Sequence, residues 1–207
     1  VDYESGNLHS AEKAFQRMAR ETGGGEVIVS DRAEDVARAD RIVLPGDGAF
    51  PACCAALKGR ENLFDALKEA VEVKARPFLG ICVGMQLMAT MGREYKDTAG
   101  LDWIAGDVTQ ITPFDKSLKV PHMGWNDLVI DHPHAVFGGI STGDHTYFVH
   151  SYHMAVADPA QRLAHVDYAG DVTAIVGCDT MLGMQFHPEK SQATGLRLIA
   201  NFLNWKP

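Results

Sequence analysis

The sequence has few of the features that staple or anchor a protein. Only four cysteines occur among 207 residues, and they form no C-x-x-C pair and no regularly spaced set. A disulfide framework is therefore excluded, and a reducing compartment is expected. No run reaches the ~18 consecutive apolar residues of a membrane helix. Val1–Glu4 has neither the basic nor the apolar part of a secretion signal. We expect a cytoplasmic protein without membrane association.

Positive charge is also scarce. The 19 Lys and Arg stand against 27 Asp and Glu, which gives a formal net charge of -8. The resulting field repels phosphate groups, so nucleic acid is not an expected partner. The chain contains no internal repeat, low-complexity tract or long linker. We expect one domain over residues 1–207, large enough to bury a core without a structural metal.

Helical and strand-like patterns alternate in the first half of the chain. Leu8, Ala11, Phe15 and Met18 recur at helical spacing until the glycine run that begins at Gly23. Strands are predicted at residues 26–30, 41–44 and 77–81, and further helices at 31–39 (with Asp31 as N-cap), 63–71 and 85–91. This alternation is typical of βαβ units with parallel strands.

The second half is richer in strands. They are predicted at residues 103–111, 127–130, 147–157, 163–168, 172–178 and 181–186, before a last helix at 194–205. An α/β first half and a β-rich second half together predict an α/β fold. We expect a mostly parallel central sheet with helices on both faces and an added antiparallel β layer.

The segment Gly80–Gln86, with sequence G-I-C-V-G-M-Q, is the strongest candidate for a nucleophile site. Cys82 lies between a predicted strand and a predicted helix, where a tight turn exposes a side chain above the carboxyl end of a sheet. Glycines two positions before and after it permit a strained backbone. The N-terminus of the following helix would favour the thiolate. The other cysteines, Cys53, Cys54 and Cys178, lack this context and are expected to pack in the core.

A cysteine nucleophile needs a base, and the base needs a group that orients it. His187 and Glu189 follow the last predicted strand and are separated by Pro188. Residues spaced by two can point to the same side of an extended backbone. Glu189 could therefore hold the ring of His187 while the other ring nitrogen faces Cys82.

Other histidines occur in pairs that resemble metal ligands. His150 and His153 form an H-x-x-H, and His132 and His134 form an H-x-H. In a strand, a spacing of three turns two side chains to opposite faces, and no third ligand has an obvious place. We expect no metal site and no cofactor.

The loop Pro45–Phe50 is a candidate for anion stabilisation. Gly46 and Gly48 allow backbone N–H groups to approach an oxyanion, and the N–H of Val83 would supply a second donor. The carboxylate of Asp47 would oppose a developing negative charge, so its side chain must point away, or the loop must flip on activation. A plain turn is the alternative interpretation.

Together, Gly80–Gln86, His187–Glu189 and Pro45–Gly48 resemble the class I, triad-type glutamine amidotransferases over nearly the whole chain. Three further segments, Asp2–Leu8, Pro121–Asn126 and Tyr147–Tyr152, are similar to those of the glutaminase subunits of imidazole glycerol phosphate synthases. The resemblance implies a flavodoxin-like fold and hydrolysis of L-glutamine to glutamate and ammonia.

The resemblance also implies roles for individual residues. Cys82 would form a glutamyl thioester, His187 would be the acid and base, and Glu189 would orient it. The residues expected to hold glutamine or its oxyanion are Gly46, Asp47, Gly48, Val83, Gln86, Ser151 and Tyr152. Asp47 departs from the family, where many members carry a small apolar residue.

A partner is implied as well, a (β/α)8-barrel cyclase subunit that receives ammonia and makes imidazole glycerol phosphate and aminoimidazole carboxamide ribotide in histidine biosynthesis. Asn7, Trp125, Asn126 and Lys190 match family positions at that interface. By residue type alone, Asn7 could instead cap a helix, Trp125 could belong to the core, and Lys190 could be a solvated charge.

Three other functions remain open at this stage. A glutaminase of another amidotransferase would share Cys82 and His187 but would not need the Pro121–Asn126 segment. A non-catalytic module would be expected to lose one member of the triad. A free-standing γ-glutamyl hydrolase or cysteine peptidase would use the same acyl-enzyme chemistry without a partner.

Overall fold

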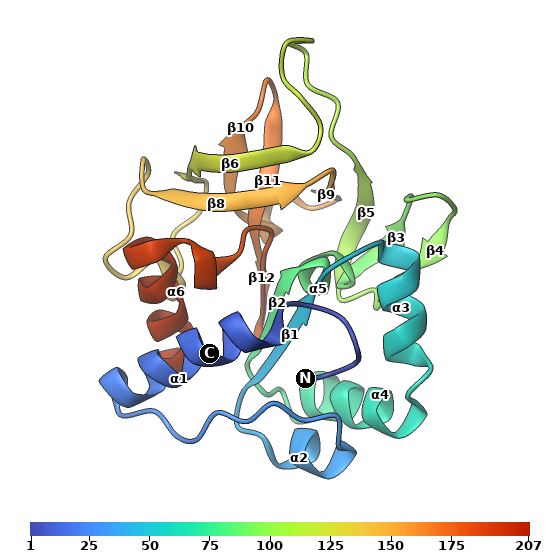
Figure 1. Cartoon of the computed structure of the whole chain (residues 1–207), viewed down its shortest axis with the longest axis vertical. Helices are drawn as coiled ribbons and strands as arrows, with labels where there is room; N and C mark the ends of the chain where they lie inside the picture. The colour runs from blue at the N-terminus through green and yellow to red at the C-terminus, as the bar shows by residue number, and fades with distance from the viewer.

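A six-stranded mixed sheet forms the centre of the fold in the computed structural model, which describes residues 1–207 (Figure 1). Its strands lie in the order β1 (Ile42–Gly46), β2 (Phe78–Cys82), β12 (Met181–Met184), β11 (Asp171–Cys178), β10 (Arg162–Asp167) and β7 (Val129–Ile130). Only β1, β2 and β12 run parallel, and the other neighbours pair antiparallel. The parallel part is thus smaller than the sequence predicted.

Two groups of helices flank β1 and β2 (Figure 1). One group is α1 (Leu8–Thr22) with α6 (Gln192–Asn204), and the other is α2 (Ala33–Arg38), α3 (Phe50–Lys58) and α4 (Glu61–Lys68), the last extended by a π-helical turn at Glu69–Val73. Strand β2 is buried along its whole length between them, as its apolar sequence predicts. As expected, α1 ends at a left-handed Gly23, whose N–H donates to the carbonyl of Ala19.

The predicted antiparallel layer is present as two smaller sheets. One contains β4 (Thr98–Ala99), β3 (Ala89–Gly92), β5 (Ile104–Gln110) and β9 (Tyr152–Val156), and the other pairs β6 (His122–Asp127) with β8 (His145–His150). Short 3-10 turns lie at Ala135–Phe137, Pro159–Gln161 and Pro188–Lys190. Phe148 of β8 contacts Phe186 edge-on with ring centroids 5.5 Å apart, which joins the β6–β8 pair to the core below it.

The structure corrects several predicted elements. Residues 26–30 form no strand: a single backbone hydrogen bond, from Asp2 N–H to the carbonyl of Ser30, is not a ladder. Asp31 does not cap α2, which begins after Arg32 without a side-chain cap. Instead, the hydroxyl of Ser30 donates to Asp35 in the first turn of the helix (2.6 Å).

Two further corrections concern segments close to Cys82. The helix predicted at 85–91 ends at Gln86, and the chain then enters β3, because this stretch pairs with β5 rather than covering the sheet. The run predicted as one strand at 147–157 is broken at Ser151. Strand β8 before the break pairs with β6, and β9 after it pairs with β5.

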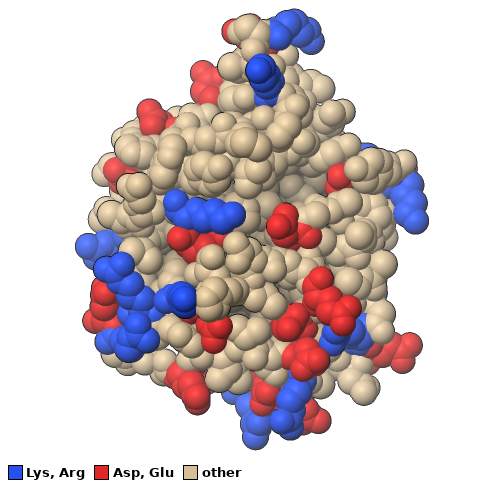
Figure 2. Space-filling view, in the orientation of Figure 1, with Lys and Arg blue, Asp and Glu red and all other residues tan.

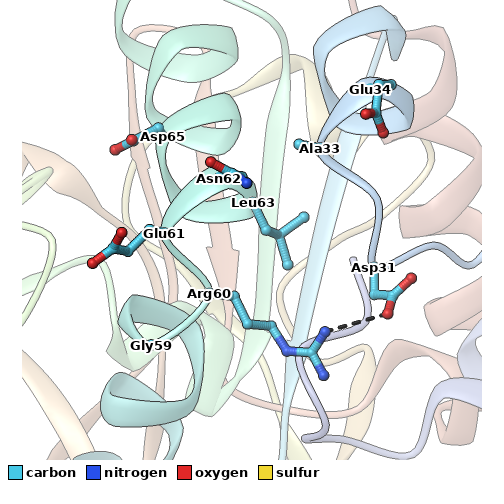
Figure 3. A pocket seen from close by; sticks show the side chains of 9 residues that line it. All are labelled: Asp31, Ala33, Glu34, Gly59, Arg60, Glu61, Asn62, Leu63 and Asp65. Carbon is cyan, nitrogen blue, oxygen red and sulfur yellow. Dashed lines mark hydrogen bonds and ion pairs between the residues drawn. The ribbon is translucent and has the colours of Figure 1, made fainter.

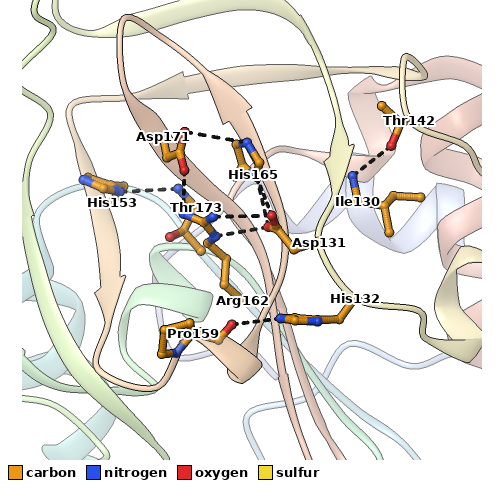
Figure 4. A network of polar contacts seen from close by, with 10 residues as sticks. All are labelled: Ile130, Asp131, His132, Thr142, His153, Pro159, Arg162, His165, Asp171 and Thr173. Carbon is orange, nitrogen blue, oxygen red and sulfur yellow. Dashed lines mark hydrogen bonds and ion pairs between the residues drawn. The ribbon is translucent and has the colours of Figure 1, made fainter.

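Two clusters of charged residues occur outside the candidate turn at Cys82. Asp131, Arg162, His165 and Asp171 tie β10 and β11 to the segment after β7, with the guanidinium of Arg162 and the ring of His165 both on the carboxylate of Asp131 (Figure 4). A hollow between α2 and α4 is lined by four acidic side chains among nine residues, with Arg60 paired to Asp31 (Figure 3). Neither cluster contains a nucleophile.

None of the helices is both long and apolar enough to span a bilayer.

Gly84, in the first turn after β2, has no room for a side chain. A Cβ at this position would lie 1.8 Å from the carbonyl oxygen of Leu44 on β1. Gly84→Ala should therefore destabilise the fold by about 2–3 kcal/mol, although alanine normally favours a helix. Urea unfolding measures the effect. Gly25→Ala, where a Cβ meets nothing within 4 Å, is the matched control, and equal stabilities for the two variants would contradict the prediction.

Candidate functional site

Cys82 stands at a sharp turn between β2 and α5 (Val83–Gln86), as the sequence predicted. Its φ of 55° and ψ of -115° are strained for a residue other than glycine. Gly46 of β1 lies opposite it in register. A Cβ on Gly46 would come within 2.6 Å of the backbone nitrogen of Gly84, so β1 packs directly against the turn. This packing holds Cys82 in its conformation.

The helix after Cys82 is shorter than expected. Because α5 has only four residues, its dipole contributes less to thiolate stabilisation than a full helix would. The nearest ionisable partner is instead a histidine from the neighbouring strand.

His187 follows β12, which pairs in parallel with β2, and this pairing brings it beside Cys82. Its Nδ1 lies 2.9 Å from Oε1 of Glu189, and both side chains are almost fully buried. The hydroxyl of Ser191 donates to the carbonyl of His187 (2.7 Å) and accepts the N–H of Tyr147 (3.0 Å). The histidine is thus fixed both through its ring and through its backbone.

The environment of His187 favours the imidazolium. Burial by itself lowers the pKa of the ring, but hydrogen bonds and charge interactions with Cys82 and Glu189 outweigh it and raise the pKa to about 10. An imidazolium placed between a sulfur and a carboxylate is the arrangement of an activated thiol with an oriented acid and base.

The predicted anion loop is tied to the segment before α1. The N–H of Asp47 donates to the hydroxyl oxygen of Ser5 (3.1 Å), and that hydroxyl donates to the carbonyl of Asp47 (2.8 Å). The thiol of Cys53 also donates to this carbonyl (3.3 Å). The side chain of Asp47 is exposed to solvent, as expected if the backbone does the work. In this conformation the Asp47 N–H is already bound and cannot serve an oxyanion.

The opposite wall of the site contains a buried amide pair. The Nε2 of Gln86 donates to the carbonyl of Tyr152 (3.0 Å) and to Oε1 of Gln185 (3.1 Å). The Nε2 of Gln185 lies 3.8 Å from the sulfur of Cys82. Sequence reasoning missed Gln185, although its position two residues before His187 on the same strand path was a usable signal.

Glu94, in the loop after β3, is a second residue that the sequence did not single out. Its carboxylate accepts the N–H of Phe50 at the start of α3 (2.7 Å). Burial, followed by the negative charge of Glu94, raises the pKa of Tyr152. A carboxylate therefore lies at the edge of the site beside Tyr152.

Comparison with known proteins agrees with this geometry. A family model described as glutamine amidotransferase class-I matches residues 7–205. The chain is 72% identical over 207 residues to the imidazole glycerol phosphate synthase subunit HisH of Ruegeria pomeroyi, and 72% identical to that of Cereibacter sphaeroides; each match covers 100% of this chain and 98% of the relative. A crystal structure of a glutamine amidotransferase superposes with a TM-score of 0.72 at 18% identity, covering 97% of this chain and 94% of the other.

The chain belongs to the class-I glutamine amidotransferases. The structural match supports the α/β, flavodoxin-like architecture of the family, with helices on both sides of the sheet.

The other cysteines of this amidotransferase occupy different environments from Cys82. Cys53 and Cys54 are buried in α3, and Cys178 is half-buried at the end of β11. Burial raises the pKa of the thiols of Cys53 and Cys178. The thiols of Cys53 and Cys178 are therefore poor nucleophiles near neutral pH. The thiol of Cys54 is buried and donates to the carbonyl of Ala99, which leaves Cys82 as the candidate.

The residues expected at a partner interface lie at the surface to different degrees. Trp125 is 45% exposed on β6, and its neighbour Met123 is 62% exposed, so Trp125 is not a core residue. Asn7 and Lys190 are exposed, and Asn7 precedes α1 without a side-chain cap bond. Asn126 is half-buried, and its amide nitrogen donates to the carbonyl of Asp167 (3.0 Å). The face over β6 and β8 carries few charges (Figure 2).

The paired histidines of the amidotransferase chain do not converge on one point. The ring of His150 lies against His122, whereas His153 accepts the N–H of Thr173 (3.4 Å). His132 contacts the carbonyl of Pro159, and His134 accepts the N–H of Val136. Each ring therefore has its own partner within the chain.

The His187–Glu189 pair makes stability depend on pH. Because the folded-state pKa of His187 is raised above its unfolded value, its contribution is fully present below ~6.5 and is lost as the pH rises through about 10. Glu189→Gln should thus destabilise the protein clearly near pH 6.5 and much less near pH 10.5. Urea unfolding at both pH values tests this expectation, and a difference that does not change with pH would contradict it.

Proposed function

We propose that this chain is the glutaminase subunit of an imidazole glycerol phosphate synthase and hydrolyses L-glutamine to glutamate and ammonia. The observation that carries the proposal is Cys82 on a strained turn beside the buried His187–Glu189 pair. Relatives with the name of that subunit, at 72% identity over the whole chain, support the choice of pathway.

The chemistry needs no cofactor. The thiolate of Cys82 attacks the carboxamide carbon of glutamine, and the imidazolium of His187 gives its proton to the departing ammonia, which leaves a glutamyl thioester. The neutral ring then takes a proton from water as the water attacks the thioester. Glutamate leaves, and the thiolate–imidazolium pair is restored. Glu189 keeps the ring in position through both steps.

The oxyanion of each tetrahedral intermediate requires backbone donors. The N–H of Val83 and the loop Gly46–Gly48 are the proposed sources. Since the N–H of Asp47 is bound to Ser5, a change of this loop would be needed before that group could contribute. This bond is consistent with a low basal activity.

Glutamine would be held by polar groups next to β9 and by the carboxylate of Glu94. Gln86, Ser151 and Tyr152 supply polar groups on one wall, next to β9. Glu94 places a negative charge beside Tyr152, which suits the α-ammonium group of the substrate.

The partner proposed for this subunit is a (β/α)8-barrel cyclase, which uses the ammonia to make imidazole glycerol phosphate and aminoimidazole carboxamide ribotide. The exposed apolar residues Met123 and Trp125 on a face with few charges support a protein contact there. Asn7, Asn126 and Lys190 are proposed to border it.

Glutamate release from glutamine, measured for the chain alone and with a barrel cyclase subunit plus its nucleotide substrate, tests the proposal. Low activity alone and strong stimulation in the mixture are expected. High activity that the partner leaves unchanged would favour a free-standing γ-glutamyl hydrolase or a glutaminase of another pathway.

Cys82→Ala should abolish glutamine hydrolysis, because no other thiol lies at the turn. The ammonia-dependent synthase activity of the assembled complex should persist, since that reaction belongs to the partner. Both rates are measured on the same complex. Cys178→Ala, a half-buried thiol on β11, serves as the control and should hydrolyse glutamine normally. Loss of both activities in a correctly assembled Cys82→Ala complex would refute the division of labour.

Trp125→Ala should weaken binding of the cyclase by about tenfold or more, because a large exposed aromatic residue at an interface centre contributes ~1–3 kcal/mol. Titration calorimetry measures the dissociation constant. Phe114→Ala removes an aromatic side chain that is 86% exposed outside the β6–β8 pair and should leave binding unchanged. Equal affinities for the two variants would remove Trp125 from the proposed interface.

A further inference from the structure

Two buried histidines that the proposed reaction does not use lie side by side beneath the β6–β8 pair. His122 of β6 is opposite His150 of β8 in the register, and Nδ1 of the first lies 3.1 Å from Nε2 of the second. They are 2% and 6% exposed. The ring of His122 also stacks between Phe148 and Tyr168, with centroid distances of 4.8 and 4.1 Å. The two rings are thus polar groups that solvent does not reach and that aromatic side chains surround.

The hydrogen bonds of these rings have only one consistent direction. Nδ1 of His150 lies 2.8 Å from the carbonyl oxygen of Tyr152, which can only accept, so this nitrogen carries the proton. Nε2 of His150 must then accept from Nδ1–H of His122. That leaves Nε2 of His122 as an acceptor for the amide nitrogen of Asn126, 3.3 Å away. A polarised chain therefore runs from Asn126 through both rings to the Tyr152 carbonyl.

A second set of bonds leads from the same carbonyl to the nucleophile. The amide nitrogen of Gln86 uses one hydrogen on the Tyr152 carbonyl and the other on Oε1 of Gln185. This fixes which way the Gln185 amide faces, with Nε2 directed at the sulfur of Cys82, 3.8 Å away. Gln185 is fully buried, so water cannot replace this donor.

We propose that His122, His150 and Gln185 are positioning residues for the glutaminase reaction. The two rings hold the Tyr152 carbonyl, the carbonyl orients the amide pair, and the amide pair presents a donor to the thiolate of Cys82. The outer end of the chain, Asn126, lies on the same strand as the exposed Trp125. The β6–β8 pair, which carries the proposed partner surface, is thereby connected to the nucleophile by hydrogen bonds alone. This connection rests on the proposed function.

The electrostatics of the two rings agree with this direction. Burial lowers the pKa of His122 to about 4, and burial together with neighbouring histidines lowers the pKa of His150 to about 3. Both rings are therefore neutral at physiological pH, as each must be in order to accept a hydrogen bond at Nε2. A neutral chain also adds no positive charge that would compete with the imidazolium of His187.

The test uses the full-length chain and a pair of variants at one position. His150→Leu removes both hydrogen bonds, whereas His150→Gln keeps one donor and one acceptor, on its terminal carboxamide. Two readouts are taken: the rate of Cys82 alkylation by iodoacetamide against pH, without glutamine or partner, and kcat and KM for glutamine with the cyclase present. Peptide mapping assigns the alkylated cysteine.

We expect His150→Leu and Gln185→Met to shift the pH of half-maximal Cys82 alkylation upward, and to lower kcat on the order of tenfold with a smaller change in KM. His150→Gln should recover most of both losses. His134→Leu is the control. The ring of His134 is half-buried, packs edge-on against Trp205 and takes no part in the hydrogen bonds that link Asn126 to Cys82. This variant should match the original protein in both readouts.

Folded His150→Leu and Gln185→Met variants with unchanged alkylation profiles and unchanged kcat would overturn the proposal. If His150→Leu does not fold, Gln185→Met decides the matter by the same two readouts. Asn126→Leu, at the half-exposed outer end, adds the alkylation readout alone, since Asn126 is also proposed to border the cyclase. If the original protein releases no glutamate with any partner, the proposed function fails. The alkylation measurements still test the hydrogen-bonded chain in that case.

Discussion

The strained turn at Cys82 is the constraint on which the rest of the site depends. A residue with φ of 55° in a buried position persists only where its surroundings leave no alternative. Here β1 supplies that enclosure, because Gly46 and Gly84 have no side chains and allow the backbone of β1 to touch the turn. The order of the strands also explains how the other groups of the site reach Cys82. With β2 between β1 and β12, the anion loop and His187 arrive on either side of the sulfur.

The buried polar groups around the sulfur provide rigidity that apolar packing alone would not. Ser191 binds the carbonyl of His187, and the carbonyl of Tyr152 receives bonds from His150 and Gln86. A buried polar group without a hydrogen-bond partner costs free energy. Each of these groups is therefore held in the position where its bond forms. Groups fixed in advance stabilise a developing charge without reorganising during the reaction.

Local chemistry in the sequence was enough to single out Cys82, His187 and Glu189, whose catalytic roles stay a prediction. Cys82, His187 and Glu189 each lie at the end of an apolar run, and the structure places Cys82 beside the pair. The class of fold followed from the same runs. Partners that are distant in the chain could not be found in this way. Gln185 meets Cys82 across 103 positions, and His122 meets His150 across 28. The place of Gln185 two residues before His187 marks the residue, but no short pattern encodes either contact.

The wrong secondary-structure predictions have a common physical origin. Apolar content marks burial but does not say which neighbour an element will pair with. Residues 26–30 are strand-like in composition yet make a single backbone bond, to Asp2, whereas residues 89–91, predicted as helix, lie in β3 and pair with β5.

The missed break at Ser151 has the same origin. Of the wrong predictions, it bears most directly on the candidate site. Because β8 and β9 join different sheets there, the carbonyl of Tyr152 sits at the junction of the two. A displacement of the β6–β8 pair relative to β5 and β9 would bend the chain at Ser151, next to that carbonyl. A continuous strand would have spread the same displacement over its whole length, so the break concentrates it close to the candidate site around Cys82.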